Sequence, residues 1–124
     1  MKKILVVGSL NMDFVIDVDK MPVPGETILA HGMRLVPGGK GANQAYAAAK
    51  LGGEVAMIGA VGDDQFGRLL KDNLTSVGVD VSGVETLAGC PTGNAIITVE
   101  KQGENSIIVV PGANAQLSKE MIDR

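Results

Sequence analysis

Several residue types that characterise other protein classes are scarce in this chain. Its 124 residues contain one cysteine, Cys90, which cannot form an internal disulfide bond, so we expect a protein of the reducing cytoplasm. There is no tryptophan, and the two phenylalanines and one tyrosine are too few for stacking nucleic-acid bases. The formal charge of −3 provides no basic surface for DNA or RNA. No apolar run is long enough to span a membrane, so we expect no membrane partner.

Glycine, by contrast, is abundant. The 17 glycines stand in short clusters between apolar runs, which indicates turns and places where backbone segments approach closely. Apolar residues make up 45% of the chain, enough to bury a core, and the length fits one domain or part of one.

The first two thirds of the chain alternate between strand and helix signals. Residues 3–9 and 54–61 are short apolar runs of the kind that is buried on both faces in a parallel sheet. Residues 40–51 are rich in alanine, and residues 65–77 place apolar side chains on one helical face. This order predicts an α/β fold with right-handed crossovers.

More exposed strands are predicted outside this pattern. They are residues 13–18, 27–36, 94–100 and 105–110, and the last two form a hairpin. We expect the strand over 27–36 to be stopped by the run that begins at Pro37.

The chain ends shortly after a helix signal. Ser118 predicts the N-cap of a helix, and Arg124 follows about one turn later. Because so short a helix is unusual, we expect the sequence to be a piece of a longer protein.

Asn11 and Asp13 follow the first predicted strand. Ligands of open α/β sheets bind beyond the carboxyl ends of strands, and residues two apart on extended backbone point the same way. Asn11 and Asp13 are therefore candidates for binding a polyol through an amide and a carboxylate. The alternative is an Asx turn that closes the strand, and position alone leaves both open.

A second candidate site is the run Gly38-Gly39-Lys40-Gly41-Ala42-Asn43. Adjacent glycines let a ligand approach backbone N–H groups, and the helix that follows begins with unpaired N–H donors. The run is not a Walker phosphate loop, because Gly41 stands where Ser or Thr is required, and Gln44 breaks the dinucleotide-binding pattern. A plain strand-to-helix turn is the alternative.

Asp63 and Asp64 form an acidic pair before the second helix. Such a pair can bind a metal or exchange protons, but a helix N-cap is its commoner role, and we favour capping. We interpret His31 as a surface residue and assign no function to Cys90.

Motifs of one protein family run through the whole chain: Gly8-Ser9-Leu10-Asn11-Met12-Asp13, Pro24-Gly25-Glu26, Gly38-Gly39-Lys40-Gly41-Ala42-Asn43-Gln44-Ala45, Val61-Gly62-Asp63-Asp64, Thr92-Gly93, Gly103-Glu104-Asn105 and Gly112-Ala113-Asn114. On these motifs the chain resembles the front part of the ribokinase family of carbohydrate kinases, also called the phosphofructokinase-B family. The second family signature, a Gly-Ala-Gly-Asp run that carries the catalytic base and an anion hole, is absent from this sequence.

The resemblance implies a ribokinase-like, doubly wound α/β core, here partial, with a small β-sheet lid. On that pattern the core comprises residues 1–12, 37–93 and 111–124, and the lid comprises residues 13–36 and 94–110. The C-terminal nucleotide-binding half is expected to be absent. The resemblance also implies a homodimer formed through the lid sheet.

The function implied by the resemblance is ATP-dependent phosphorylation of D-ribose to ribose 5-phosphate by the complete enzyme. ATP and Mg²⁺ are the implied cofactors, with a monovalent cation as an optional activator, all bound mainly outside this chain. No catalytic residue and no metal ligand is expected here. The residues implied to bind the sugar are Asn11, Asp13, Gly38, Gly39, Lys40, Asn43, Ala95 and Ile107, the last two on the lid.

Two alternatives stay open from the sequence. One is a family kinase for another sugar or for a nucleoside, and the other is a non-catalytic fragment that binds sugar or dimerises. For Lys40, contact with developing phosphate charge or with solvent alone is a further alternative to sugar binding.

Overall fold

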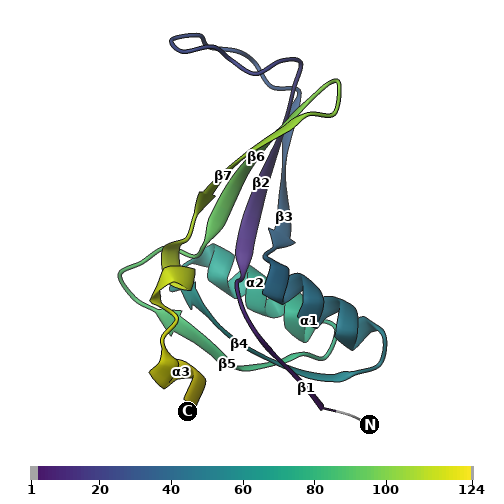
Figure 1. The fold of residues 1–124 in the computed structure, drawn as a ribbon, viewed down its shortest axis with the longest axis vertical. Coiled ribbons are helices and arrows are strands. Elements are labelled where there is room, and N and C mark those ends of the chain that lie inside the picture. Colours follow the sequence, from purple (N-terminus) through teal and green to yellow (C-terminus); the bar gives the residue numbers. More distant parts are fainter. Residues whose placement is uncertain (1–2, 124) are drawn as a thin grey trace.

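The computed structural model describes residues 3–123, which form two β-sheets with helices packed beside them (Figure 1). In the first sheet, sheet A, β1 (Lys3–Val7), β4 (Glu54–Gly62) and β5 (Asp80–Leu87) run parallel in the order β1-β4-β5. The predicted parallel sheet is therefore confirmed, and the fold is mixed α/β.

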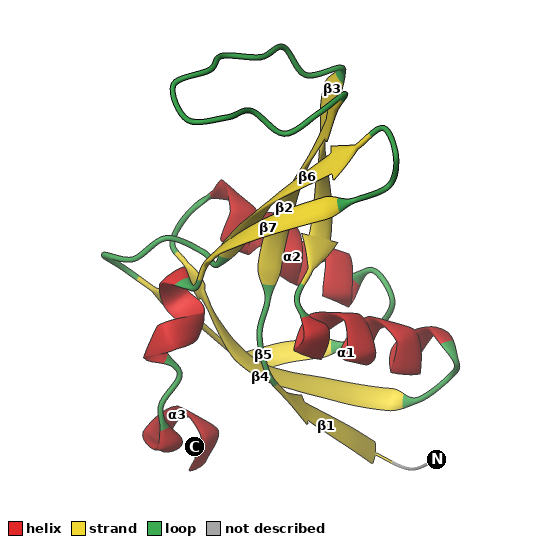
Figure 2. Cartoon of the chain, turned by 45° about the horizontal axis from the view of Figure 1, so that its top comes forward, coloured by secondary structure: helices red, strands yellow, loops and turns green. Residues whose placement is uncertain are grey.

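Two helices, α1 (Lys40–Lys50) and α2 (Gln65–Thr75), pack beside sheet A (Figure 2). Leu70 and Leu74 lie four residues apart on α2 and are almost fully buried, because residues at this spacing share one helical face. They meet Met57 of β4 in a core that also contains Leu10, at the end of the β1–β2 loop. This core fixes the carboxyl ends of β1 and β4 relative to the helices.

The second sheet, sheet B, rises away from sheet A (Figure 1). Its order is β3-β2-β6-β7, with β2 (Asn11–Val18) antiparallel to β3 (Gly32–Gly38) and parallel to β6 (Asn94–Glu100), and with β7 (Asn105–Val110) antiparallel to β6. The predicted hairpin of β6 and β7 is confirmed.

An aromatic contact joins sheet B to the core, beside the buried side chain of Met12 in β2. The ring of Phe14 in β2 meets that of Phe66 in α2 edge-on, with ring centroids 5.4 Å apart. Such an arrangement is the favoured one for aromatic pairs.

After β7 the chain returns to sheet A. The 3₁₀ helix η1 (Gly112–Gln116) packs on β4, and α3 (Lys119–Asp123) follows. Ser118 Oγ accepts a hydrogen bond of 3.4 Å from the N–H of Met121, as an N-cap does, so this prediction is confirmed.

Two strand predictions need correction. Strand β5 was not predicted, because Asp80, Ser82 and Glu85 interrupt its apolar residues, and the strand is defined by its pairing with β4. The strand predicted over 27–36 instead spans Gly32–Gly38 and runs through Pro37. Proline is tolerated there because β3 is an edge strand.

Within residues 3–123, no helix combines the length and apolar character needed to cross a membrane. The predicted core segments 1–12 and 111–124 include Met1, Lys2 and Arg124, which lie outside the described residues.

Candidate functional site

The two sheets meet where the chain leaves β1 and enters β2. Helix α1 begins directly after β3 and packs its first turn against this loop. The N–H of Ala42 donates a hydrogen bond of 3.0 Å to the carbonyl oxygen of Ser9. A Cβ on Gly41 would lie 2.8 Å from the Cα of Gly8, so this contact between backbones requires glycine.

Gly39 makes the turn from β3 into α1. Its φ of 97° is in the left-handed region, and a Cβ there would lie 2.6 Å from the carbonyl oxygen of Ser9 and 3.0 Å from the N of Asn11. As the N-cap residue of α1, Gly39 has no side chain to bond the first N–H groups of the helix. The predicted glycine run is thus a tight strand-to-helix turn placed beside Asn11.

Asp13 lies in the middle of this junction. In β2 it pairs with Val36 of β3 on one side and with Ala95 of β6 on the other. Its side chain is half-buried, and burial raises the pKa of the carboxyl above its ordinary value. Within the described part of the chain, no group donates a hydrogen bond to this carboxylate. A half-buried carboxylate without a donor is typical of a ligand site.

Gly38 makes room for the Asp13 carboxylate. A Cβ on Gly38 would overlap Oδ2 of Asp13 and would lie 2.8 Å from its Cγ. The absence of a side chain at Gly38 therefore determines where this carboxylate can lie.

The strand register places several predicted site residues on one face of sheet B. Paired residues of neighbouring strands share a face, and so do residues two apart on one strand. Asn11 pairs with Gly38, Asp13 pairs with Ala95, and Ile97, two residues beyond Ala95, pairs with Ile107. Ala95 is 4% exposed, whereas Ile107 is 58% exposed. Asn11, Asp13, Gly38, Ala95 and Ile107 thus lie on one face of sheet B, on which Gly38 and Ala95 are buried and Ile107 is exposed.

Lys40 and Asn43 stand apart from this surface. Both are exposed side chains in the first turn of α1, after the Gly39 turn. Their position places them near the junction, but no hydrogen bond or ion pair joins either side chain to Asp13 among the described residues.

Asn11 is held by Asn114, a residue that was not predicted to belong to the site. The side-chain Nδ2 of Asn114, in η1, donates to Oδ1 of Asn11 at 2.8 Å. The signal was present in the motif Gly112-Ala113-Asn114, but a sequence alone does not show what the side chain contacts.

Asp64 caps α2, which confirms that prediction. Its carboxylate accepts hydrogen bonds from the N–H of Gly67 at 2.8 Å and from the N–H and hydroxyl of Thr92 at 2.9 and 2.5 Å. Burial works to raise the pKa of Asp64, but the bonds from Thr92 and Gly67 outweigh it and hold this pKa below its ordinary value. Asp63 only approaches Arg68, at 3.8 Å, with both side chains 68% exposed.

His31 is exposed, as predicted, and its Nε2 lies 2.7 Å from Oδ1 of Asp19. Among residues 3–123, no three His, Cys, Asp or Glu side chains are grouped so that they could hold a metal ion.

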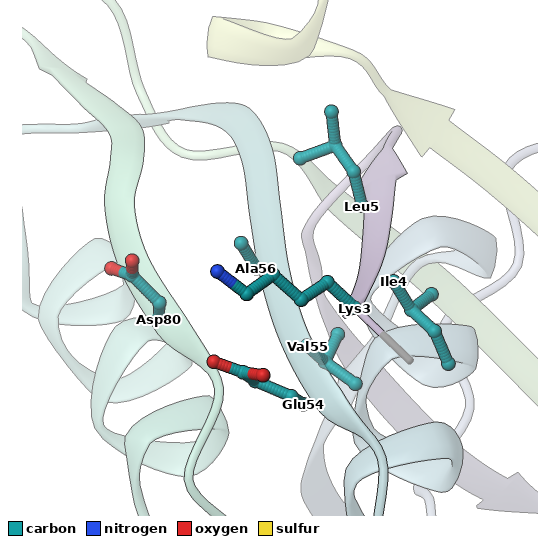
Figure 3. A pocket seen from close by; sticks show the side chains of 7 residues that line it. All are labelled: Lys3, Ile4, Leu5, Glu54, Val55, Ala56 and Asp80. Atoms are coloured by element: carbon teal, nitrogen blue, oxygen red, sulfur yellow. The ribbon is translucent and has the colours of Figure 1, made fainter. Parts of the chain in front are cut away.

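A separate hollow opens at the other end of sheet A (Figure 3). Figure 3 shows Lys3 pointing between Glu54 and Asp80, at the amino ends of the strands. Ligands of parallel sheets bind at the carboxyl ends, so the junction around Asp13 is the better candidate site.

A model of the pfkB family carbohydrate kinases matches residues 1–123. The chain belongs to this family. The ribokinase of Bacillus subtilis (strain 168) is 47% identical over 118 residues, which are 95% of this chain and 40% of that protein. The deoxyribokinase of Salmonella typhi is 44% identical over 121 residues, which are 98% of this chain and 40% of that protein.

A structure of Arabidopsis thaliana ribokinase complexed with ribose and ATP matches this fold with a TM-score of 0.83 at 40% sequence identity. The match covers 90% of this chain and 36% of that one. The predicted ribokinase-like α/β fold is confirmed by this likeness. The chain spans about 40% of the length of the curated relatives it matches.

Proposed function

We propose that this pfkB-family chain forms the sugar-binding part of a kinase that phosphorylates D-ribose to ribose 5-phosphate. In this reaction the γ-phosphoryl group of ATP passes to the terminal hydroxymethyl oxygen of the sugar. The complete protein carries out the reaction, and this chain contributes Asn11, Asp13 and the turn at Gly39 to ribose recognition.

The observation that carries this proposal is the Asp13 carboxylate. It is half-buried beside Gly38, and no described residue donates a hydrogen bond to it. Two neighbouring sugar hydroxyls supply the missing donors. A site built to bond a hydroxyl strongly rejects an analogue that lacks it, because the buried polar group is then left unpaired.

Sheet B acts in this proposal as a lid over the sugar. Ala95 and Ile107 share a face with Asp13, so in this proposal they line the same side of the sugar as the Asp13 carboxylate and add apolar contact beside it. Closing such a lid expels water, which otherwise competes with the sugar hydroxyl as phosphoryl acceptor. The proposal includes a lid of residues 13–36 and 94–110 over a core of residues 1–12, 37–93 and 111–124.

The phosphoryl donor is ATP with Mg²⁺, and the chemistry of Mg²⁺ is to neutralise phosphate charge. Proteins usually hold Mg²⁺ through one or two carboxylates together with the phosphates of the nucleotide, and in this proposal ATP and Mg²⁺ are bound mainly by the rest of the complete protein. We therefore assign to this chain only the binding and orientation of the sugar. Lys40 and Asn43, exposed at the start of α1, complete the sugar contacts.

A second copy of the chain is the proposed partner of sheet B. Its edge strand β7 exposes Ile107, Ile108 and Val109, which are 58%, 64% and 55% exposed. A lid-to-lid homodimer buries these side chains, and an exposed apolar edge strand favours pairing with another chain. The free cysteine Cys90 supports a cytoplasmic location for this enzyme.

A second candidate substrate is 2-deoxyribose. The Salmonella typhi deoxyribokinase and the Bacillus subtilis ribokinase match this chain at 44% and 47% identity, so overall similarity separates the two sugars poorly. The alternative from another class is a chain that binds sugar without catalysing its phosphorylation.

The test starts with ribose binding by calorimetry, followed by ribose-dependent ADP release from Mg-ATP. Both are measured on the 124-residue chain and on a form of the length of the curated relatives, with 2-deoxyribose, fructose and adenosine as competing substrates. We expect the longer form to turn over ribose, and the chain alone to bind ribose without turnover. A longer form that binds no sugar would overturn the proposal, and preferred turnover of 2-deoxyribose would select the second candidate.

A further inference from the structure

We propose that Asn114 orients the side-chain amide of Asn11, so that Asn11 offers an N–H donor to the sugar and not a carbonyl acceptor. This inference rests on the proposed function, because it assigns a positioning residue to the same site. Asn114 comes from η1, so the residue that sets the chemistry of Asn11 lies 103 positions further along the chain.

The amide of Asn114 is fully used by the loop before β2. Its Oδ1 accepts the N–H of Leu10 at 3.0 Å, and its Nδ2 donates to the carbonyl oxygen of Leu10 at 3.0 Å and to Oδ1 of Asn11 at 2.8 Å. A carboxamide has two N–H donors, and both are occupied here. Because Leu10 is fully buried, its backbone groups need these bonds.

These bonds determine which way each amide points. An asparagine can ordinarily be turned so that its oxygen and nitrogen exchange places. The N–H of Leu10 can only donate, so the atom of Asn114 that faces it must be the oxygen. The nitrogen of Asn114 then faces Asn11, so the atom of Asn11 that accepts must be its oxygen. The Nδ2 of Asn11 is thereby turned away from Asn114.

Two glycines make this contact between amides possible. A Cβ on Gly93 would overlap Nδ2 of Asn114 and would lie 2.6 Å from Oδ1 of Asn11. Gly112 has a φ of 53°, and the N–H of the next residue, Ala113, donates to the carbonyl oxygen of Pro91 at 2.8 Å. The segment before β6 thus holds η1 in place and leaves space for the Asn114 side chain.

The orientation matters because of Asp13. Its carboxylate on the same face of β2 only accepts hydrogen bonds when ionised. A hydroxyl has one proton, so it can donate to Asp13 while it accepts from the Asn11 amide. With Asn11 reversed, two acceptors would compete for that proton and the hydroxyl oxygen would lose its donor. Asn114 therefore gives Asn11 and Asp13 complementary roles toward a sugar diol.

The test is the substitution Asn114→Asp, which keeps the shape of the side chain but removes both N–H donors. The new carboxylate still accepts the N–H of Leu10, and it now accepts from Asn11, which must reverse. Asn73→Asp on α2, remote from the site, is the control for the added charge. Urea unfolding of both variants monitors the loss of the bond to the Leu10 carbonyl.

The first readout needs no sugar. In the unmodified protein we expect slow hydrogen exchange for the side-chain N–H groups of Asn114 and fast exchange for those of Asn11, measured by ¹⁵N NMR. In Asn114→Asp the Asn11 N–H groups should become protected. Fast exchange of the Asn114 groups in the unmodified protein would overturn the proposal, and this measurement decides even if the variant does not fold.

The second readout is ribose affinity by calorimetry in the form that binds ribose. We expect Asn114→Asp to weaken binding about 10-fold, which corresponds to about 1.4 kcal/mol. On an Asn11→Ala background the same substitution should have almost no further effect, because its route to the sugar is gone. An additive loss would mean that Asn114 acts only on stability, and would overturn the inference. If the unmodified protein binds no sugar, the proposed function fails, and the exchange measurement alone decides the orientation of Asn11.

Discussion

Asp13 illustrates, at the scale of one residue, the conflict between stability and binding at this site. Burial disfavours the ionised form of its carboxyl, and no described residue compensates with a hydrogen bond. A group of this kind weakens the folded state without ligand and becomes useful when a ligand supplies donors. Three predictions concern this carboxylate and Gly38 beside it.

Replacing Asp13 by alanine should weaken ribose binding of the complete enzyme. The loss of one charged hydrogen bond costs about 1.5–3 kcal/mol. This corresponds to roughly a 10- to 150-fold higher dissociation constant, to be measured by calorimetry. An unchanged affinity would contradict the assignment of Asp13 to the sugar.

Asp13 should also make the stability of the protein depend on pH. Burial raises the pKa of Asp13 in the folded state above its ordinary value of about 3.8. Below that ordinary value the carboxyl is protonated in both states and does not change the free energy of unfolding. As pH rises from there through the raised pKa, ionisation of the carboxyl increasingly destabilises the folded state. Without sugar, Asp13→Asn should therefore melt at a higher temperature than the unmodified chain at pH 7. The difference in melting temperature between the two proteins should shrink towards pH 4. A variant less stable at pH 7 would show that Asp13 has a donor after all.

Gly38 should be intolerant of a methyl group for a local reason. In Gly38→Ala the new Cβ collides with the Asp13 carboxylate, so we expect weaker ribose binding, by about 10-fold or more if one charged hydrogen bond is lost. Gly32→Ala is the matched control on the same strand, because a Cβ there meets nothing within 4 Å. Equal ribose affinities for the two variants would show that Gly38 does not shape the site.

At the scale of elements, one cap joins α2 to the start of β6. Asp64 bonds the N–H of Gly67 within the helix and both polar groups of Thr92 before β6. Thr92 Oγ1 in turn accepts the N–H of Gly62 at 2.9 Å. A single carboxylate therefore fixes a helix of the core relative to a strand of sheet B.

Asp64→Ala should destabilise the protein by at least the ~1 kcal/mol typical of a lost N-cap, and by up to about 3 kcal/mol because the Thr92 groups lose their acceptor. Since the pKa of Asp64 is lowered, its stabilising effect is present above the ordinary pKa and is lost as pH falls through the lowered one. The difference in free energy of unfolding between Asp64→Ala and the unmodified chain, measured with urea, should therefore vanish under strongly acidic conditions. Asp63→Ala is the control and should change stability by under about 0.5 kcal/mol.

The exposed edge strand β7 should determine whether the protein forms a dimer. If sheet B pairs with a second copy, a charge in place of Ile108, which is 64% exposed, should shift a dimer towards monomer in analytical ultracentrifugation. We expect Ile108→Lys to raise the dimer dissociation constant at least 10-fold. A monomeric unmodified protein at the same concentration would contradict the lid-to-lid dimer.

At the scale of the whole molecule, the sequence predicted what depends on local pattern. The parallel strands β1 and β4, both long helices and the β6–β7 hairpin follow from apolar periodicity and turn residues, and all are present. The motifs around Asn11 and Gly39 could be located in the same way, and the structure places them side by side. Their function in sugar binding is still a prediction.

Features that depend on distant partners could not be predicted. β5 was missed because its polar residues form a strand only through pairing with β4. The start of β3 was misplaced because Thr27 to Ala30 have no partner strand, whereas Gly32 pairs with Asp17. The function of Asn114 could not be predicted for the same reason, because its partners Leu10 and Asn11 are more than 100 positions away in the sequence.

The distance along the chain between Leu10 and Asn114, 104 residues, has a consequence for how the protein is made. Contacts between residues so far apart in sequence form slowly, because a long loop must close first. During synthesis from the N-terminus, Asn11 and Asp13 emerge early, but the amide that orients Asn11 emerges only after both sheets have been translated. We expect a nascent chain that stops before residue 114 to form sheet A and its helices yet to recognise sugar poorly. Sugar binding then requires the loop between Leu10 and Asn114 to close first.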